Sequence, residues 1–132
     1  MPDGFPTREQ IDRFLVDKID SVPQLEALLL IWRNRPRQWS CDQIARDLYI
    51  SPELAEVELN HLVHQGLILS SPDRPERFSL NLDPEDRPLM LTAVDEMYRR
   101  ELVRISNLIH AKAPRAMRDF ARAFRFKKEE RK

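Results

Sequence analysis

The chain has 132 residues and carries 22 basic and 22 acidic side chains, so its formal net charge is zero. With 42% hydrophobic and 33% charged residues, it has the composition of one folded, helix-rich domain and not that of a disordered chain. A single cysteine excludes an internal disulfide. No apolar run is long enough for a membrane span, so we expect a cytoplasmic protein.

Residues 1–20 are predicted to form an N-terminal extension with one short helix. Two prolines and a glycine open the segment. Ile11, Phe14 and Leu15 then fall on one side of a helix over residues 7–18. We expect this helix to pack on the main domain.

Three more helices are predicted, and each begins at a serine that can cap it. A glutamine three residues later, or a proline in the first helical turn, strengthens each start. The three serines are Ser21, Ser40 and Ser51. Pro36 ends the first of these helices, and Gly66 favours the left-handed backbone that ends the third.

The third of these helices, after Ser51, has an apolar side and an acidic side. We expect Leu54, Leu59 and Leu62 to face inward. The exposed positions are then expected to carry Glu53, Glu56 and Glu58.

A β-hairpin and a long helix are predicted after Gly66. Residues 67–69 and 77–82 have the short apolar pattern of two strands, and the residues between them include two prolines. The segment from Asp83 then begins a helix whose apolar residues are three or four positions apart. These residues are Leu91, Val94, Tyr98, Leu102, Ile105 and Ile109.

The C-terminal segment reverses the charge balance of the chain. Residues 98–132 hold 12 Lys/Arg and 4 Asp/Glu, whereas residues 1–97 hold 10 and 18. A last helix is predicted over residues 115–128, with Phe120 and Phe124 on one face among arginines. Such a segment can pack on a partner subunit, contact phosphates, or lie on an anionic membrane. Its interspersed acidic residues favour the partner subunit. The remaining alternative is a surface helix packed against the acidic part of its own chain.

The run QIARDLYISPELAEVELNHLVHQGLI, residues 43–68, resembles a winged helix-turn-helix domain. Ala45 is small where the next helix crosses, Leu48 and Ile50 bury the turn, and Gly66 lets the chain enter the hairpin, or wing. The resemblance implies a mainly α fold with a small β-hairpin. The winged helix-turn-helix domain would span residues 21–82, and long C-terminal helices would follow over residues 83–132.

The resemblance also implies a function. The long helix after the wing resembles the dimerising segments of MarR- and PadR-type regulators, so we expect a bacterial, homodimeric transcriptional regulator that binds double-stranded DNA. The residues expected at the DNA are Pro52, Glu53, Glu56, Asn60, His61, Arg46, Arg74 and Arg77. The residues expected at the dimer interface are Leu91, Val94, Tyr98, Leu102, Ile105, Ile109, Phe120 and Phe124.

Two features depart from the usual pattern of such domains. Tyr49 occupies a turn position that often holds glycine, and it would need a costly positive φ there unless the turn adopts another geometry. Glu53 and Glu56 stand where DNA-binding relatives tend to carry polar or basic residues, and carboxylates repel phosphates. One alternative is therefore a protein-interaction module whose acidic recognition helix binds a basic partner. The other is a solvated surface, with Glu56 paired to His61 or Asn60.

Enzyme, cofactor and metal functions find little support in the sequence. Two glycines in the whole chain exclude a glycine-rich phosphate loop, and no catalytic constellation is evident. His61 and His64 lack a third ligand for a metal. Cys41 has no second cysteine to resolve an oxidised form. We expect Trp32, and less clearly Trp39, to belong to the core and not to a stacking platform.

Overall fold

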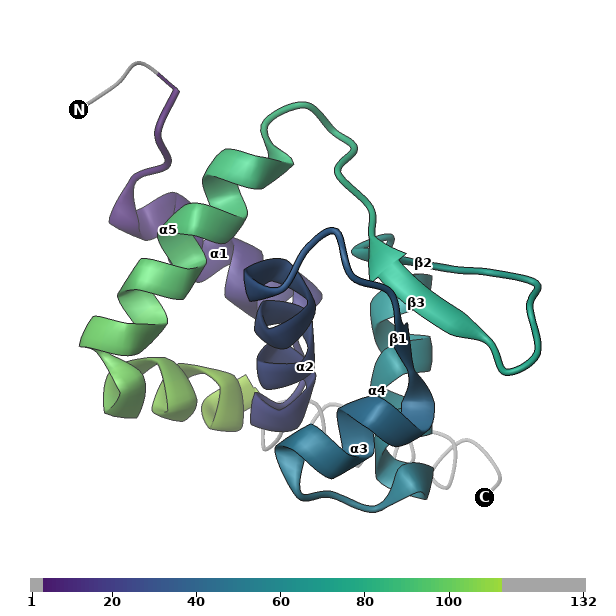
Figure 1. The fold of residues 1–132 in the computed structure, drawn as a ribbon. Coiled ribbons are helices and arrows are strands. Elements are labelled where there is room, and N and C mark those ends of the chain that lie inside the picture. The colour runs from purple at the N-terminus through teal and green to yellow at the C-terminus, as the bar shows by residue number, and fades with distance from the viewer. Residues whose placement is uncertain (1–3, 113–132) are drawn as a thin grey trace, which may run out of the picture.

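The protein consists of helices packed around a small antiparallel sheet, as Figure 1 shows for the computed structural model, which describes residues 4–112. The elements are α1 (Arg8–Lys18), α2 (Val22–Arg33), β1 (Trp39–Ser40), α3 (Cys41–Leu48), α4 (Pro52–His64), β2 (Ile68–Ser70), β3 (Arg77–Leu80) and α5 (Arg87–Arg100). Residues 102–112 are also helical. The mainly α fold with a hairpin after the third capped helix is confirmed. The helix predicted over residues 115–128 lies outside the described residues.

The predicted helix starts are confirmed by their capping hydrogen bonds. The hydroxyls of Ser21, Ser40 and Ser51 each accept a bond from the backbone N–H three residues later. Ser40 and Gln43 complete a capping box, because the Gln43 side chain accepts from the Ser40 N–H at 3.0 Å. Gly66 has a φ of 75°, which is the left-handed conformation predicted for the residue after the helix.

The sheet has a third strand that was not predicted. β1 pairs with β3, so the strand order is β1-β3-β2, with Trp39 opposite Phe78. Trp39 is only 1% exposed, and the Arg37 guanidinium lies 3.8 Å from its ring centroid. A strand of two residues is too short to show an alternating pattern. Trp39 therefore belongs to the core, as Trp32 does.

The core is centred on α2, which contacts α3, α4 and α5. The α2 side chains Leu25, Leu28, Leu29 and Ile31 have no exposed surface. Figure 1 shows α1 and α5 on the side of α2 away from the sheet, and α3, α4 and the hairpin on the other. This division leaves α4 and the hairpin together at one side of the molecule.

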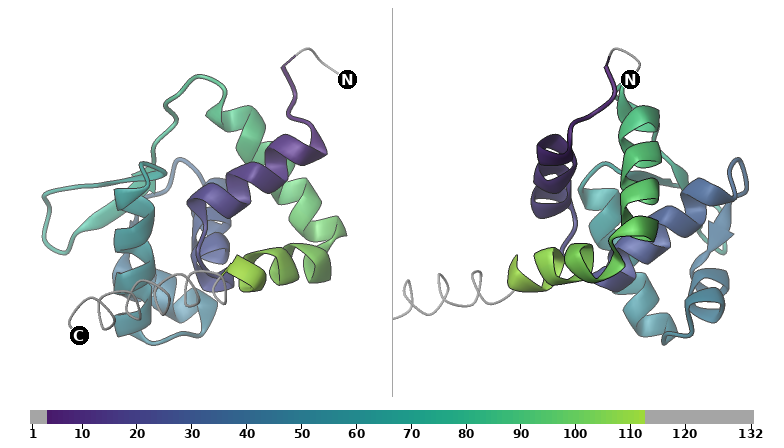
Figure 2. Two further views of the ribbon diagram at one scale, coloured as in Figure 1. Left: turned by 180° about the vertical axis from the view of Figure 1, so that it is seen from behind. Right: turned by 90° about the vertical axis from the view of Figure 1, so that its left-hand side faces the viewer.

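The prediction of one long helix after the hairpin is wrong, because the chain turns sharply at Glu101. α5 ends at Arg100, and Glu101 has a φ of −128° and a ψ of 46°. The views in Figure 2 show the next helical segment, residues 102–112, running at a steep angle to α5. The apolar periodicity continues across Glu101, so the sequence pattern gives no sign of the break.

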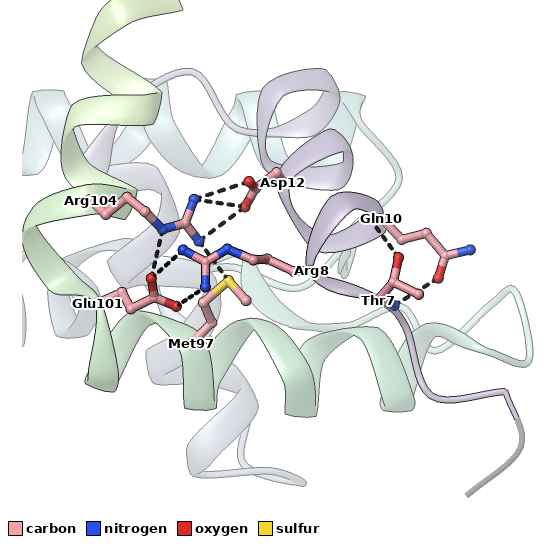
Figure 3. A network of polar contacts seen from close by, with 7 residues as sticks. All are labelled: Thr7, Arg8, Gln10, Asp12, Met97, Glu101 and Arg104. Carbon is pink, nitrogen blue, oxygen red and sulfur yellow. Dashed lines mark hydrogen bonds and ion pairs between the residues drawn. The ribbon is translucent and has the colours of Figure 1, made fainter. Parts of the chain in front are cut away.

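Ion pairs tie this corner to α1. The Arg8 guanidinium donates to both Glu101 carboxylate oxygens, at 2.7 and 3.2 Å. Arg104 Nε donates to the same carboxylate at 2.8 Å, and Arg104 Nη1 lies 3.0 Å from Asp12 Oδ2. Figure 3 shows how these four side chains converge from α1, the corner and the last helical segment. The network depends on residues about 90 positions apart, which periodicity cannot predict.

The corner changes the position of the residues predicted to form a dimer interface. Because the chain folds back on itself, five of them lie in the core of the single chain: Leu91, Val94, Tyr98, Ile105 and Ile109. Leu102 is 51% exposed. Phe120 and Phe124 lie outside the described residues. Dimerisation stays a prediction, and among the described members of the set only Leu102 offers exposed surface to a second copy.

The ion pairs of Glu101 predict a loss of stability in acid. The hydrogen bond from Arg104, supported by the charges of Arg104 and Arg8, lowers the pKa of Glu101 from its ordinary value of 4.5. A carboxyl whose pKa is lowered by folding stabilises the folded state above its unfolded pKa, and this contribution disappears as the pH falls through the folded pKa. Glu101→Gln should therefore narrow the difference in melting temperature between neutral pH and pH values below 4.5. Glu96→Gln, an exposed α5 carboxyl without an ion pair in residues 4–112, serves as control. Equal pH profiles for the two variants would contradict the prediction.

Candidate nucleic-acid interface

One side of α4 is uncovered by the rest of the described chain. α4 buries Ala55, Glu58, Leu59 and Leu62 against the domain. Its opposite side exposes the residues that we call the outer face of α4: Pro52, Glu53, Glu56, Val57, Asn60, His61 and His64. Five residues predicted at the DNA, namely Pro52, Glu53, Glu56, Asn60 and His61, thus lie together on this face.

The predicted positions of Leu54 and Glu58 are wrong. Leu54 is 38% exposed, whereas Glu58 is only 8% exposed. Glu58 Oε2 accepts hydrogen bonds from Ser21 Oγ at 2.6 Å and Gln24 Nε2 at 3.3 Å. These two donors at the start of α2 compensate the burial of the carboxylate, so Glu58 joins α4 to α2. Its partners lie more than 30 positions away, which is why sequence spacing placed it at the surface.

In the turn before α4, Tyr49 adopts the positive φ, and the alternative of another turn geometry is wrong. Its φ of 56° and ψ of 41° are left-handed, and its N–H bonds back to the end of α3. The side chain is 94% exposed, so packing does not compensate the unfavourable backbone. A strained, exposed aromatic residue thus immediately precedes α4.

Replacing Tyr49 by glycine should stabilise the fold. Glycine adopts a positive φ without steric cost, and we expect a gain of about 0.5–1 kcal/mol in the free energy of unfolding after the larger entropy of the unfolded chain is included. Urea unfolding of Tyr49→Gly measures this, with Tyr49→Ala, which keeps the strain, as control. A glycine variant that is less stable than the alanine variant would show that the tyrosine side chain contributes to folding.

His61 is paired with Asp20 and not with Glu56, contrary to the alternative considered from the sequence. His61 Nδ1 lies 3.4 Å from Asp20 Oδ2, and Lys112 Nζ lies 2.7 Å from Asp20 Oδ1. The hydrogen bond from Lys112 lowers the pKa of Asp20. Glu56 keeps its carboxylate free of ion pairs within residues 4–112. His61 therefore marks the edge of the outer face of α4, where the helical segment 102–112 ends.

A groove of about 300 Å³ lies where α3, α4 and the β2–β3 hairpin meet. Its lining includes four carboxylates, from Asp42, Glu53, Glu56 and Glu76. Burial, followed by the charges of these carboxylates, raises the pKa of the Cys41 thiol, whose Sγ donates to the Pro52 carbonyl at 3.4 Å. The thiol is kept protonated, which is the opposite of the environment of a reactive cysteine. We call this hollow the acidic groove.

Three arginines provide positive charge near the outer face of α4. Arg46 on α3, Arg74 in the hairpin loop and Arg77 at the start of β3 are exposed and make no ion pair within residues 4–112. The exposed carboxylates of the same elements are those of Asp42, Asp47, Glu53, Glu56, Asp73 and Glu76. Three arginines against six carboxylates give this surface a net charge of −3, without the histidines. Phosphate contact from α3, α4 and the hairpin thus depends on these arginines.

Other kinds of site find no support in the part of the chain that the structure describes. Within residues 4–112, no group of three or more histidine, cysteine or carboxylate side chains is placed to hold a metal ion. No helix in that range is both long and apolar enough to span a membrane.

The chain has the winged-helix fold of MarR-type regulators, as solved structures show. A mutant of Staphylococcus aureus MepR bound to an oligodeoxyribonucleotide superposes with a TM-score of 0.53 at 15% identity, covering 89% of this chain and 88% of that one. A mutant of Lactococcus lactis ZitR in its apo form superposes with a TM-score of 0.51 at 21% identity, covering 90% of this chain and 95% of that one. Heme-free PefR superposes with a TM-score of 0.53 at 15% identity, covering 72% of this chain and 88% of that one. No protein-family model and no curated protein matches the sequence.

Proposed function

We propose that this protein is a transcriptional regulator that binds duplex DNA through the outer face of α4 and the β2–β3 hairpin. The observation that carries the proposal is a helix that the rest of residues 4–112 leaves uncovered, beside a projecting hairpin whose arginines make no ion pair in that range. A helix fits the major groove, and arginines at the tip of a hairpin can enter the adjacent minor groove. MepR, which shares the fold, has been solved bound to an oligodeoxyribonucleotide and is described as a transcription regulator.

The side chains of the outer face suggest how bases would be read. In the major groove, Asn60 can bond to adenine, and Glu53 or Glu56 can accept from the amino group of cytosine. These carboxylates provide selectivity only after Arg46, Arg74 and Arg77 have contacted the phosphates. We therefore expect weak binding to DNA of arbitrary sequence and a preference for sites that place cytosine opposite α4.

We also propose that the regulator is a homodimer of a bacterial cytoplasm. Leu102 and Val103, just after the corner at Glu101, are 51% and 72% exposed, and they offer apolar surface to a second copy. A two-fold dimer would present two α4 helices to half-sites about one turn of DNA apart. Sedimentation of the chain and of Leu102→Glu/Val103→Glu tests this, because the charged pair should shift the protein to the monomer.

Reversing the two hairpin charges should weaken DNA binding. Arg74→Glu/Arg77→Glu removes two phosphate contacts and adds repulsion, so we expect duplex affinity to fall by at least about tenfold and the slope of log affinity against log salt to flatten by about 1.8. Fluorescence anisotropy with genomic duplexes at two salt concentrations measures both. Arg13→Glu/Arg100→Glu is the matched control, because both arginines are exposed on α1 and α5. If both double variants lose the same duplex affinity, the loss comes from the change in net charge alone, and the proposed contact of the hairpin with DNA is wrong.

The acidity of the outer face favours a second candidate, the binding of a basic protein segment. Four carboxylates in one groove are suited to arginine or lysine side chains. On this account the protein shows no duplex binding even at low salt, and Glu53→Lys/Glu56→Lys abolishes capture of the basic partner. Glu53→Lys/Glu56→Lys thus separates the two candidates: it should raise the affinity for DNA if the outer face of α4 binds DNA, and abolish partner binding if that face binds a basic protein segment.

A further inference from the structure

The outer side of α4 and the turn before it combine exposed apolar and acidic side chains. Tyr49, Leu54 and Val57 are 94%, 38% and 51% exposed, and Leu54 and Val57 each adjoin in sequence a carboxylate that lines the acidic groove, that of Glu53 and that of Glu56. Solvent-exposed apolar residues clustered on one helix face indicate a surface that a macromolecular segment covers. The surrounding carboxylates require this segment to be basic as well as aromatic.

The sequence after the last described residue has this composition. Residues 113–132 hold eight Lys/Arg, three Asp/Glu and three phenylalanines, Phe120, Phe124 and Phe126. Arginine pairs with carboxylates through two parallel hydrogen bonds and also stacks on aromatic rings such as that of Tyr49. We propose that the C-terminal segment, residues 113–132, binds the outer face of α4 in the same chain.

The position of residue 112 supports an intramolecular contact. Lys112 Nζ donates to the Ile19 carbonyl at 3.2 Å and to Asp20 Oδ1 at 2.7 Å. Asp20 is the partner of His61 on α4. The described chain therefore ends one side chain away from the C-terminal half of α4. A hollow of about 320 Å³, lined by Asp20, Asn60, His61, His64 and Gln65, lies at this point.

The length of the segment is sufficient to cover the face. From His61 to Glu53 the helix rises by roughly 12 Å, at about 1.5 Å per residue. Twenty residues span roughly 66 Å when extended and roughly 30 Å when helical. The segment can therefore begin at the hollow beside His61 and reach the acidic groove at the start of α4 in either conformation.

The contact occupies the surface that the proposed function assigns to DNA, but it does not rest on that function. The acidic residues of α4 repel phosphates and attract the segment, so the segment neutralises the same charges that oppose DNA binding. Duplex DNA and the segment cannot both cover the outer face of α4. The inference therefore adds a competitor within the chain to the proposed regulator, and it can be tested without DNA.

A spin label on the segment tests the contact in the full-length chain. The variant Cys41→Ser/Ala123→Cys carries a single thiol, and a nitroxide at residue 123 broadens amide signals that lie near it. We expect loss of amide intensity for residues 53–61 of α4 in the ¹⁵N-labelled chain, and recovery of that intensity in high salt. The same variant without the nitroxide should give an NMR spectrum with the amide signal dispersion of the original protein, which confirms that the variant folds.

Charge reversal provides the controls. Arg118→Glu/Arg122→Glu should remove the broadening. Adding Glu53→Lys/Glu56→Lys to that variant should restore the broadening, because both sets of charges are then reversed. Arg13→Glu/Arg100→Glu, on α1 and α5, should leave the broadening unchanged. The absence of broadening on α4 in the low-salt sample would overturn the proposal. So would broadening that appears when spin-labelled ¹⁴N chains are mixed with unlabelled ¹⁵N chains but not within one chain, because the segment would then bind a second copy.

Discussion

Replacing Glu53 and Glu56 together by lysine should raise the affinity of the protein for duplex DNA of arbitrary sequence by at least about tenfold. Both carboxylates are exposed on the outer face of α4, where they would lie among phosphates. Two lysines remove this repulsion and add two phosphate contacts, each of which steepens the slope of log affinity against log salt by about 0.9. Anisotropy titrations at about 50 mM and about 200 mM salt measure the affinity and the slope.

The matched control for this substitution is Glu9→Lys/Glu96→Lys. Both residues are exposed, on α1 and α5, and neither makes an ion pair within residues 4–112. The control changes the net charge by the same amount at a distance from α4. If the two double variants gain affinity equally, α4 does not approach the DNA and the proposed orientation is wrong.

Replacing Trp39 by alanine should lower the free energy of unfolding by about 3–5 kcal/mol. Trp39 is 1% exposed, pairs with Phe78 across the sheet and lies beneath the Arg37 guanidinium. Its removal leaves a cavity where β1 and β3 meet, so we expect the hairpin to lose order before the helices do. Chemical unfolding followed by circular dichroism measures the loss.

Trp39→Phe separates packing from hydrogen bonding. The indole Nε1–H is buried without a hydrogen-bond partner in residues 4–112, and such a group costs about 1–3 kcal/mol. Phenylalanine keeps most of the ring and removes this donor, so its cost should be well below that of alanine. A Trp39→Ala variant within about 1 kcal/mol of the original protein would show that β1 is not part of the stable core.

The features that the sequence predicted well are those controlled by neighbouring residues. Ser40 with Gln43, Ser51 with Pro52, and Gly66 after α4 each specify a backbone state within four residues. The left-handed backbone of Tyr49 is one of the two outcomes that the resemblance left open at this turn, the other being a different turn geometry. The winged-helix fold itself was predicted from the resemblance of residues 43–68 to that domain.

The features that were missed depend on contacts between distant residues. β1 is formed by the pairing of Trp39 with Phe78, and the corner at Glu101 is accompanied by ion pairs of Glu101 with Arg8 and of Arg104 with Asp12. Glu58 is buried because Ser21 and Gln24 donate to it. Local periodicity contains no information on such partners. For the same reason, the apolar stripe from Leu91 to Ile109 suggested a dimer interface, whereas the corner folds it into the core of the chain.

At the candidate interface, the fold favours DNA binding whereas the net charge opposes it. The uncovered α4 and the projecting hairpin have the arrangement that suits duplex DNA, while the net charge of −3 on α3, α4 and the hairpin opposes phosphate contact. Arg46, Arg74 and Arg77, which make no ion pair within the described part of the chain, can offset this charge only if they contact the DNA backbone. Binding should therefore be selective and sensitive to salt.

The most direct test of the proposed function is the affinity of the unmodified, full-length protein for a pool of duplex DNA fragments as the salt concentration is raised. We predict binding to a subset of fragments at about 50 mM salt, with log affinity falling linearly against log salt at a slope of about −2.7, which corresponds to three arginine contacts at about 0.9 each. No fragment bound at that salt concentration, or an affinity that does not change with salt, would contradict DNA recognition by α4 and the hairpin.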